Sequence, residues 1–134
     1  MFLKGELKAR TARRKKPSHN EDNLQIACVK WFGLQYPALA FLLIHPANGG
    51  SRKMLEAVRF KKMGVRAGVA DLLLLVPDSD SPFLCLELKD GERGRQSREQ
   101  KEWQKLVESV GAKYVVVRTI EQFISTIKNY LENR

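Results

Sequence analysis

Two acidic residues and a lysine are spaced so that they could do chemistry together. Asp71 lies in the apolar run 70–76, and Glu87 and Lys89 end a second apolar run, 83–89. Side chains of a strand alternate between faces, so Glu87 and Lys89 project from one side while leucines occupy the other. Two carboxylates are a ready ligand set for Mg²⁺. With a cation to stabilise developing negative charge, the set suits phosphodiester hydrolysis.

These side chains meet only if the two apolar runs form an antiparallel hairpin. The segment 77–82 between them has a proline at each end and Asp and Ser residues inside, which is typical of a turn. Antiparallel pairing then places Asp71 beside Glu87 near the open end of the hairpin. The same charges could instead form an ion-pair cluster that only stabilises the sheet end, and spacing alone leaves both interpretations open.

The pattern of Asp71 followed by Glu87-Leu88-Lys89 resembles the D…ExK core of the PD-(D/E)xK nucleases, and specifically the VRR-NUC family. The resemblance extends over residues 20–120. Its other motifs are Asn48-Gly49-Gly50, the segment 64–72, Gly94-Arg95-x-Ser97-x-x-Gln100 and Trp103. One departure is Ala70, where the family usually has proline. Since that proline is no ligand, the change affects loop rigidity more than catalysis.

The resemblance implies a metal-dependent endonuclease, with Mg²⁺ as cofactor and Mn²⁺ as a substitute. The implied metal ligands are Asp71, Glu87, the Leu88 backbone carbonyl and Glu21, the last directly or through water. Lys89 would orient or help deprotonate the attacking water and stabilise the transition state. Stand-alone phage and bacterial members further imply a homodimer that cuts branched DNA, such as Holliday junctions or flaps, because a dimer places two sites on two strands.

Glu21 lies at the start of a helix predicted over residues 21–36, on its inward stripe. The resemblance implies an active-site role for it, with Gln25 one turn further on as a secondary candidate. Asp22 replaces Glu21 if the register is off by one. Glu21 also fits a capping box with Ser18, in which it would bond back to the Ser18 amide.

Gln100 heads the buried stripe of a helix predicted over residues 98–110. From there it can position Glu87 or the attacking water, but it fits a capping box with Ser97 as well. The other residues of this helix predicted to face the core are Trp103, Leu106, Val107 and Val110.

Two further candidates lie where a strand predicted over residues 41–44 meets a turn-forming loop. His45, at the strand end, could act as a base or contact a phosphate, although a lone histidine there also has a purely structural interpretation. Asn48, in the loop, belongs to a motif of the resemblance.

A net charge of +9 points to a polyanionic partner, for which nucleic acid is the default. The candidate phosphate contacts are Lys15, Lys16, Arg52, Lys53, Arg66, Arg93, Arg95 and Arg98. A non-catalytic nucleic-acid-binding module is the alternative. It would explain the charge, but Asp71 and Glu87 would repel a bound phosphate unless a cation intervened.

We expect a basic, disordered arm over residues 1–17 and one nuclease-like domain over residues 18–134. The predicted class is α/β: a restriction-endonuclease-like core with a mixed four-stranded sheet flanked by helices, in the order α-β-α-β-β-α-β-α. The first residues lack the apolar run of a secretory signal, so we expect the cytoplasm of a bacterial or phage-infected cell.

Overall fold

A computed structural model describes residues 20–46 and 54–134, and its centre is a four-stranded sheet in the order β1-β2-β3-β4. The strands are β1 (Leu43–Ile44), β2 (Leu72–Leu74), β3 (Leu84–Leu88) and β4 (Lys113–Val117). The first three pair antiparallel, whereas β3 and β4 are parallel. The predicted mixed sheet is therefore confirmed.

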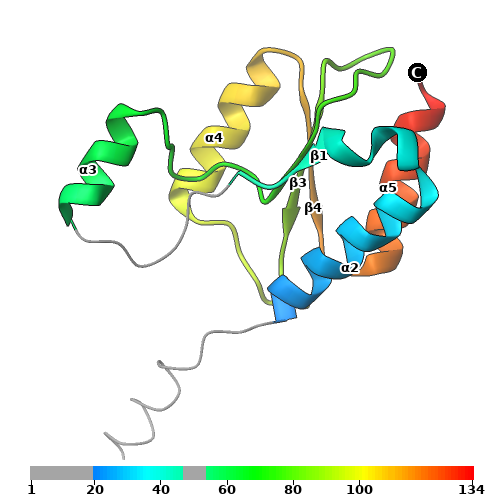
Figure 1. Ribbon diagram of the computed structural model, residues 1–134, viewed down its shortest axis with the longest axis horizontal. Helices are drawn as coiled ribbons and strands as arrows, with labels where there is room; N and C mark the ends of the chain where they lie inside the picture. The colour runs from blue at the N-terminus through cyan, green and yellow to red at the C-terminus, as the bar shows by residue number, and fades with distance from the viewer. Residues whose placement is uncertain (1–19, 47–53) are drawn as a thin grey trace, which may run out of the picture.

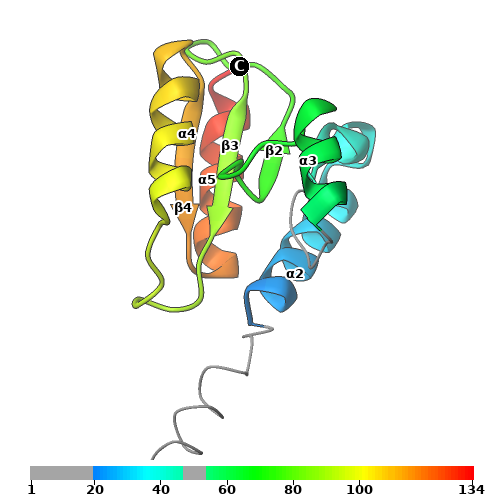
Figure 2. The same ribbon diagram turned by 90° about the vertical axis from the view of Figure 1, so that its left-hand side faces the viewer.

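Helices cover both faces of this sheet (Figures 1 and 2). The helices are α2 (Asn20–Gln35), α3 (Met54–Lys62), α4 (Arg98–Ser109) and α5 (Ile120–Glu132), with a 3₁₀ helix η1 at Pro37–Leu42. Side chains of α2 and α5 pack on one face, and those of α4 pack on the other. The predicted α/β class with flanking helices is confirmed. None of the helices within the described ranges is long and apolar enough to cross a membrane.

The predicted hairpin is present, with Leu72 opposite Leu86 and Leu74 opposite Leu84. Strand β3 lies in the middle of the fold, and all five of its residues are buried. Its leucines join the core formed with α2 and α5, while Cys85 joins the core formed with α4. The alternation therefore sends Glu87 into the α4 side of the protein.

Two local predictions were wrong. Residues 41 and 42 belong to the 3₁₀ helix rather than to a strand, because Pro37 favours a helical start. Phe41 is accordingly 97% exposed and does not pack on the described part of the sheet. In the helix predicted over residues 98–110, Leu106 of α4 and Val110, which follows its end, are exposed instead of facing the core. That helix covers the sheet along a narrow stripe, of which Val107 is the buried member.

A glycine contact fixes the loop before Asp71 against α4. Gly68 has a φ of +83°, and a Cβ atom there would lie 2.3 Å from the Glu99 backbone oxygen. Only glycine permits both this conformation and this approach. The loop that leads into Asp71 therefore rests on the first turn of the helix that carries Gln100.

Candidate active site

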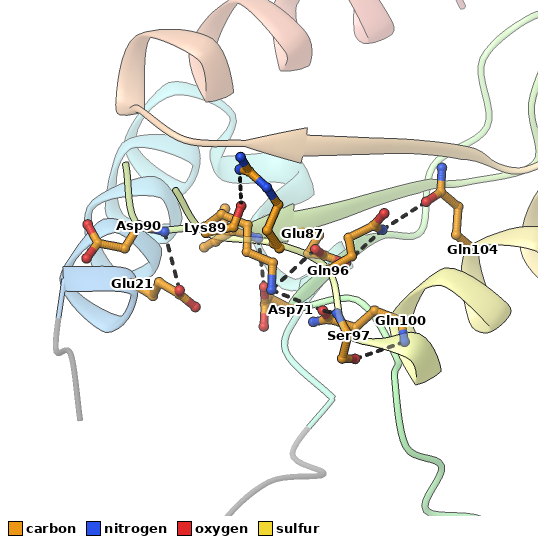
Figure 3. Close-up of polar contacts among 12 residues, drawn as sticks. Glu21, Asp71, Glu87, Lys89, Asp90, Gln96, Ser97, Gln100 and Gln104 are labelled. Atoms are coloured by element: carbon orange, nitrogen blue, oxygen red, sulfur yellow. Dashed lines mark hydrogen bonds and ion pairs between the residues drawn. The ribbon is translucent and has the colours of Figure 1, made fainter. Parts of the chain in front are cut away.

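Asp71 and Glu87 lie side by side at the open end of the hairpin (Figure 3). Asp71 immediately precedes β2, and its Oδ2 accepts a hydrogen bond of 2.7 Å from the Leu88 amide of β3. The pairing of β2 with β3 ends at Leu72 and Leu86, and beyond it the Asp71 carboxylate takes the place of a backbone carbonyl as the acceptor for the Leu88 amide. Glu87 is completely buried, while Asp71 keeps partial access to solvent.

The two carboxylate oxygens of Glu87 have different surroundings. Its Oε1 accepts hydrogen bonds from the Tyr114 hydroxyl and, at 3.3 Å, from the side-chain amide of Gln96. Its Oε2 is buried, has no hydrogen-bond donor among residues 20–46 and 54–134, and lies 3.5 Å from the Lys89 ammonium. Burying a charged carboxylate oxygen without a hydrogen bond costs free energy unless a cation lies beside it.

Gln100 forms the predicted capping box, and the side chain that it positions is Lys89, where the sequence suggested Glu87 or the attacking water. Its Oε1 accepts hydrogen bonds from the Lys89 ammonium at 3.0 Å and from the Ser97 amide at 2.8 Å. The Ser97 hydroxyl in turn accepts a hydrogen bond from the backbone amide of Gln100, which completes the capping box of α4. The helix cap and the lysine are therefore held by one atom, and Figure 3 shows Lys89 directed at this cap.

Burial raises the pKa of the Asp71 carboxyl above its usual value. The negative charges of Glu87 and Glu21 raise this pKa further, while the Leu88 amide and the Lys89 ammonium lower it. Three negative groups thus share a poorly solvated region with one cation. Such crowding favours either proton uptake or cation binding.

Glu21 approaches the pair without joining it. Its Oε2 accepts a 3.3 Å hydrogen bond from the Asp90 amide, just beyond β3. Asp22 is exposed, and Gln25 is partly buried one turn further along α2. Across residues 20–46 and 54–134, no three His, Cys, Asp or Glu side chains converge closely enough to hold one metal ion. The acidic centre of this structure is the pair Asp71 and Glu87.

His45 contacts the backbone of Asp71 rather than its carboxylate. The ring Nδ1 lies 2.6 Å from the Asp71 carbonyl oxygen. Because a carbonyl only accepts, Nδ1 carries the proton and donates. His45 therefore helps to fix the segment that presents Asp71. Asn48 lies outside the described residues.

Four of the candidate phosphate contacts are exposed on the surface, and four lie outside the residues that the structure describes. Lys15, Lys16, Arg52 and Lys53 lie outside the described residues. Arg66, Arg93, Arg95 and Arg98 are all exposed. Arg66 donates to the Lys61 carbonyl, Arg95 donates to the Glu92 carbonyl, and Arg98 pairs with Glu102. A guanidinium has five N–H donors, so the contacts of Arg95 and Arg98 leave donors for a phosphate.

Sequence reasoning missed three residues that hold the site. Tyr114 and Gln96 bind Glu87, and Arg118 donates a 2.6 Å hydrogen bond to the Gly91 carbonyl in the loop after β3. No spacing along the chain signals these contacts, because they depend on how β4 pairs with β3. The alternation of side chains along β4 is a signal that could have pointed to Tyr114, since it places every second residue of that strand on the α4 side of the sheet.

The residues present fit a divalent metal ion. Mg²⁺ and Mn²⁺ prefer hard oxygen ligands. Glu87 offers the buried Oε2, which receives no hydrogen bond from any described residue, and Asp71 lies beside it with its Oδ2 bonded to the Leu88 amide. The backbone carbonyl of Leu88 belongs to the same strand end.

A solved structure described as a VRR_NUC domain protein is similar to this chain, with a TM-score of 0.74 and 27% sequence identity. The likeness covers 88% of this chain and 93% of that one. No family model matches the chain, and no curated protein matches it. The structural likeness confirms the resemblance to the VRR-NUC family that the motifs indicate.

Replacing Asp71 by Asn should stabilise the protein in EDTA at pH 7. The amide oxygen of Asn can still accept from Leu88, while the crowded negative charge is removed. Because the pKa of Asp71 is raised in the folded state, its ionisation destabilises the fold above that pKa. The penalty disappears below the unfolded-state pKa of about 3.9. Urea unfolding from pH 4 to pH 8 should show the advantage of the variant growing with pH.

Glu121→Gln is the control, since it removes the same charge from an exposed position of α5. It should show little of this pH dependence. A variant Asp71→Asn that is less stable than wild type at every pH would contradict the crowding of the carboxylates.

Proposed function

We propose that this protein is a metal-dependent DNA endonuclease that hydrolyses phosphodiester bonds. The observation that carries the proposal is Glu87, a completely buried carboxylate with one oxygen that lacks a hydrogen-bond donor, beside Asp71 and Lys89. The likeness to a VRR_NUC domain protein supports nuclease chemistry for this arrangement.

Asp71, Glu87 and the Leu88 carbonyl would hold Mg²⁺ or Mn²⁺. When bound, such an ion supplies Lewis-acid polarisation of the phosphate and favours formation of the attacking nucleophile. Glu21 would contribute through water, because its own oxygen already accepts from the Asp90 amide. The raised pKa of Asp71 means that binding of a cation competes with binding of a proton at this carboxyl.

Lys89 supplies the positive charge that the chain itself contributes. Its ammonium is mostly buried and is aimed by Gln100, so little reorganisation is needed when negative charge develops on a phosphate. In that position it would also orient the attacking water. Gln100 acts through Lys89 and is a positioning residue.

The substrate we propose is DNA, with branched forms such as junctions or flaps preferred, and the active form a homodimer in the cytoplasm. The net charge of +9 and the exposed arginines near the site support a nucleic-acid partner. Exposed apolar side chains on α3 and η1 support self-association, with Met54, Leu55 and Phe41 at 81%, 85% and 97% exposure.

Cleavage of labelled DNA should require a divalent metal and the lysine. We expect cutting of a four-way junction or a flap with Mg²⁺ or Mn²⁺, slower cutting of linear duplex and single strands, and none in EDTA. Lys89→Met should lower the rate by about 100-fold or more, because it removes a preorganised charge from the transition state. Glu87→Gln, which keeps an acceptor for Tyr114, should be folded and inactive.

Lys105→Met, on the exposed side of α4, is the control for lost charge and should cut at close to the wild-type rate. Tight DNA binding without cleavage under any metal would contradict the proposal and favour the non-catalytic binding module.

A second comparison separates the two roles of Gln100. Ser97→Ala removes only the helix cap and should cost about 1 kcal/mol of stability with cleavage nearly unchanged. Gln100→Ala keeps the Ser97 hydroxyl cap but removes the other half of the capping box and the acceptor that aims Lys89, so it should cost no more stability than Ser97→Ala and additionally slow cleavage. Thermal unfolding and single-turnover rates of both variants give the answer. Equal rates in the two variants would show that Gln100 serves only as a cap.

A further inference from the structure

The asymmetry between the two oxygens of Glu87 needs a cause. Within the part of the chain that the structure describes, two donors, the Tyr114 hydroxyl and the Gln96 side-chain amide, converge on Oε1, while Oε2 receives none. A carboxylate with one donor can turn about its terminal bond, since that torsion is broad and roughly two-fold. Two donors on the same oxygen fix the plane of the group. They also leave Oε2 directed toward Lys89.

Tyr114 is held in place by the sheet and by α4. It lies opposite Cys85 in the parallel ladder, and both side chains belong to the core on the α4 side. The Trp103 ring packs against it, with the ring centroids 6.2 Å apart. Because a carboxylate oxygen can only accept, the Tyr114 hydroxyl is the donor in its bond to Glu87.

The orientation of Gln96 is set by a relay of hydrogen bonds. The Gln104 Nε2 donates to the Glu108 carboxylate at 3.2 Å, and a carboxylate can only accept. Gln104 must therefore turn its oxygen toward Gln96, whose Nε2 donates to it at 2.8 Å. The same nitrogen also donates to Glu87, and Figure 3 shows Gln96 between these two partners.

We infer that Tyr114, assisted by Gln96, is a positioning residue that holds Oε1 of Glu87 so that Oε2 is presented to a divalent cation. The inference rests on the proposed function and adds to it the residues that set metal affinity. It also gives Trp103 a role, as the packing support of the Tyr114 ring. Outer partners of metal ligands typically contribute 10–100-fold to metal affinity or activity.

The test is Mn²⁺ binding to the full chain, measured by titration calorimetry for wild type, Tyr114→Phe and Tyr130→Phe. Tyr114→Phe keeps the ring and its packing, and we expect it to weaken Mn²⁺ binding by about 10–100-fold. Tyr130→Phe is the matched control. It also removes a buried hydroxyl, which donates to the Val76 carbonyl at 2.7 Å, but it belongs to the core on the other side of the sheet.

Both variants should melt at a lower temperature, yet only Tyr114→Phe should bind Mn²⁺ more weakly. Raising the Mn²⁺ concentration should restore much of its cleavage, because the lost property is affinity. Equal Mn²⁺ affinity in Tyr114→Phe and wild type would overturn the inference and leave the proposed nuclease standing. Failure of the wild type to bind Mn²⁺ would overturn both.

If Tyr114→Phe does not fold, Gln96→Met carries the test, because Gln96 lies in the loop before α4 and is only partly buried. Methionine matches the length of the side chain but cannot donate to Glu87. A weaker Mn²⁺ affinity in this variant supports the inference, and an unchanged affinity overturns it.

Discussion

The pairing of Glu87 with Lys89 inside the protein is the interaction on which the rest of the arrangement depends. Glu87 has no exposed surface, and its counter-charge lies 3.5 Å away on the same strand. Removing one member of a buried pair typically costs about 3–5 kcal/mol, because the other charge is left uncompensated. The surrounding fold must therefore supply hydrogen-bond donors for Oε1 of Glu87, an acceptor for Lys89, and room for a cation beside Oε2 of Glu87.

Each of these needs is met by a different element. Strand β4 brings Tyr114 to Glu87, and the capped start of α4 brings Gln100 to Lys89. Gly68 lets the loop before Asp71 rest directly on that same helix start. Because the contacts share α4, a shift of this helix would disturb the lysine and the aspartate loop together. These contacts fix the lysine and the aspartate loop relative to each other, as preorganised electrostatic stabilisation requires.

The central part of the site could be predicted from the sequence because it follows from the two-residue period of strands. That period places Glu87 and Lys89 on one face and makes Asp71 the neighbour of Glu87 once the hairpin forms. Glu21 was harder to interpret, since a helix start suits both capping and chemistry. In the structure it accepts a hydrogen bond from the Asp90 amide, a contact between residues that are 69 positions apart, while Ser18, its predicted capping partner, lies outside the described residues.

The remainder could not be predicted, because it depends on tertiary register. Tyr114 reaches Glu87 only through the alignment of β4 with β3, and His45 reaches the Asp71 carbonyl only because β1 pairs beside β2. Hydropathy also misplaced Leu106 and Val110, which look like core residues on a helical wheel but are each 66% exposed. Whether such an apolar helix residue is buried depends on which part of the helix lies over the sheet.

The most direct measurement is anomalous diffraction from crystals of the protein grown with Mn²⁺, compared with crystals of Glu87→Gln. The account predicts one anomalous peak, or a close pair of peaks, at the carboxylates of Asp71 and Glu87 in the wild type, and loss of that density in the variant. An ion bound elsewhere, or none at this position while the protein still cleaves DNA, would contradict the assignment of Asp71 and Glu87 as the metal site.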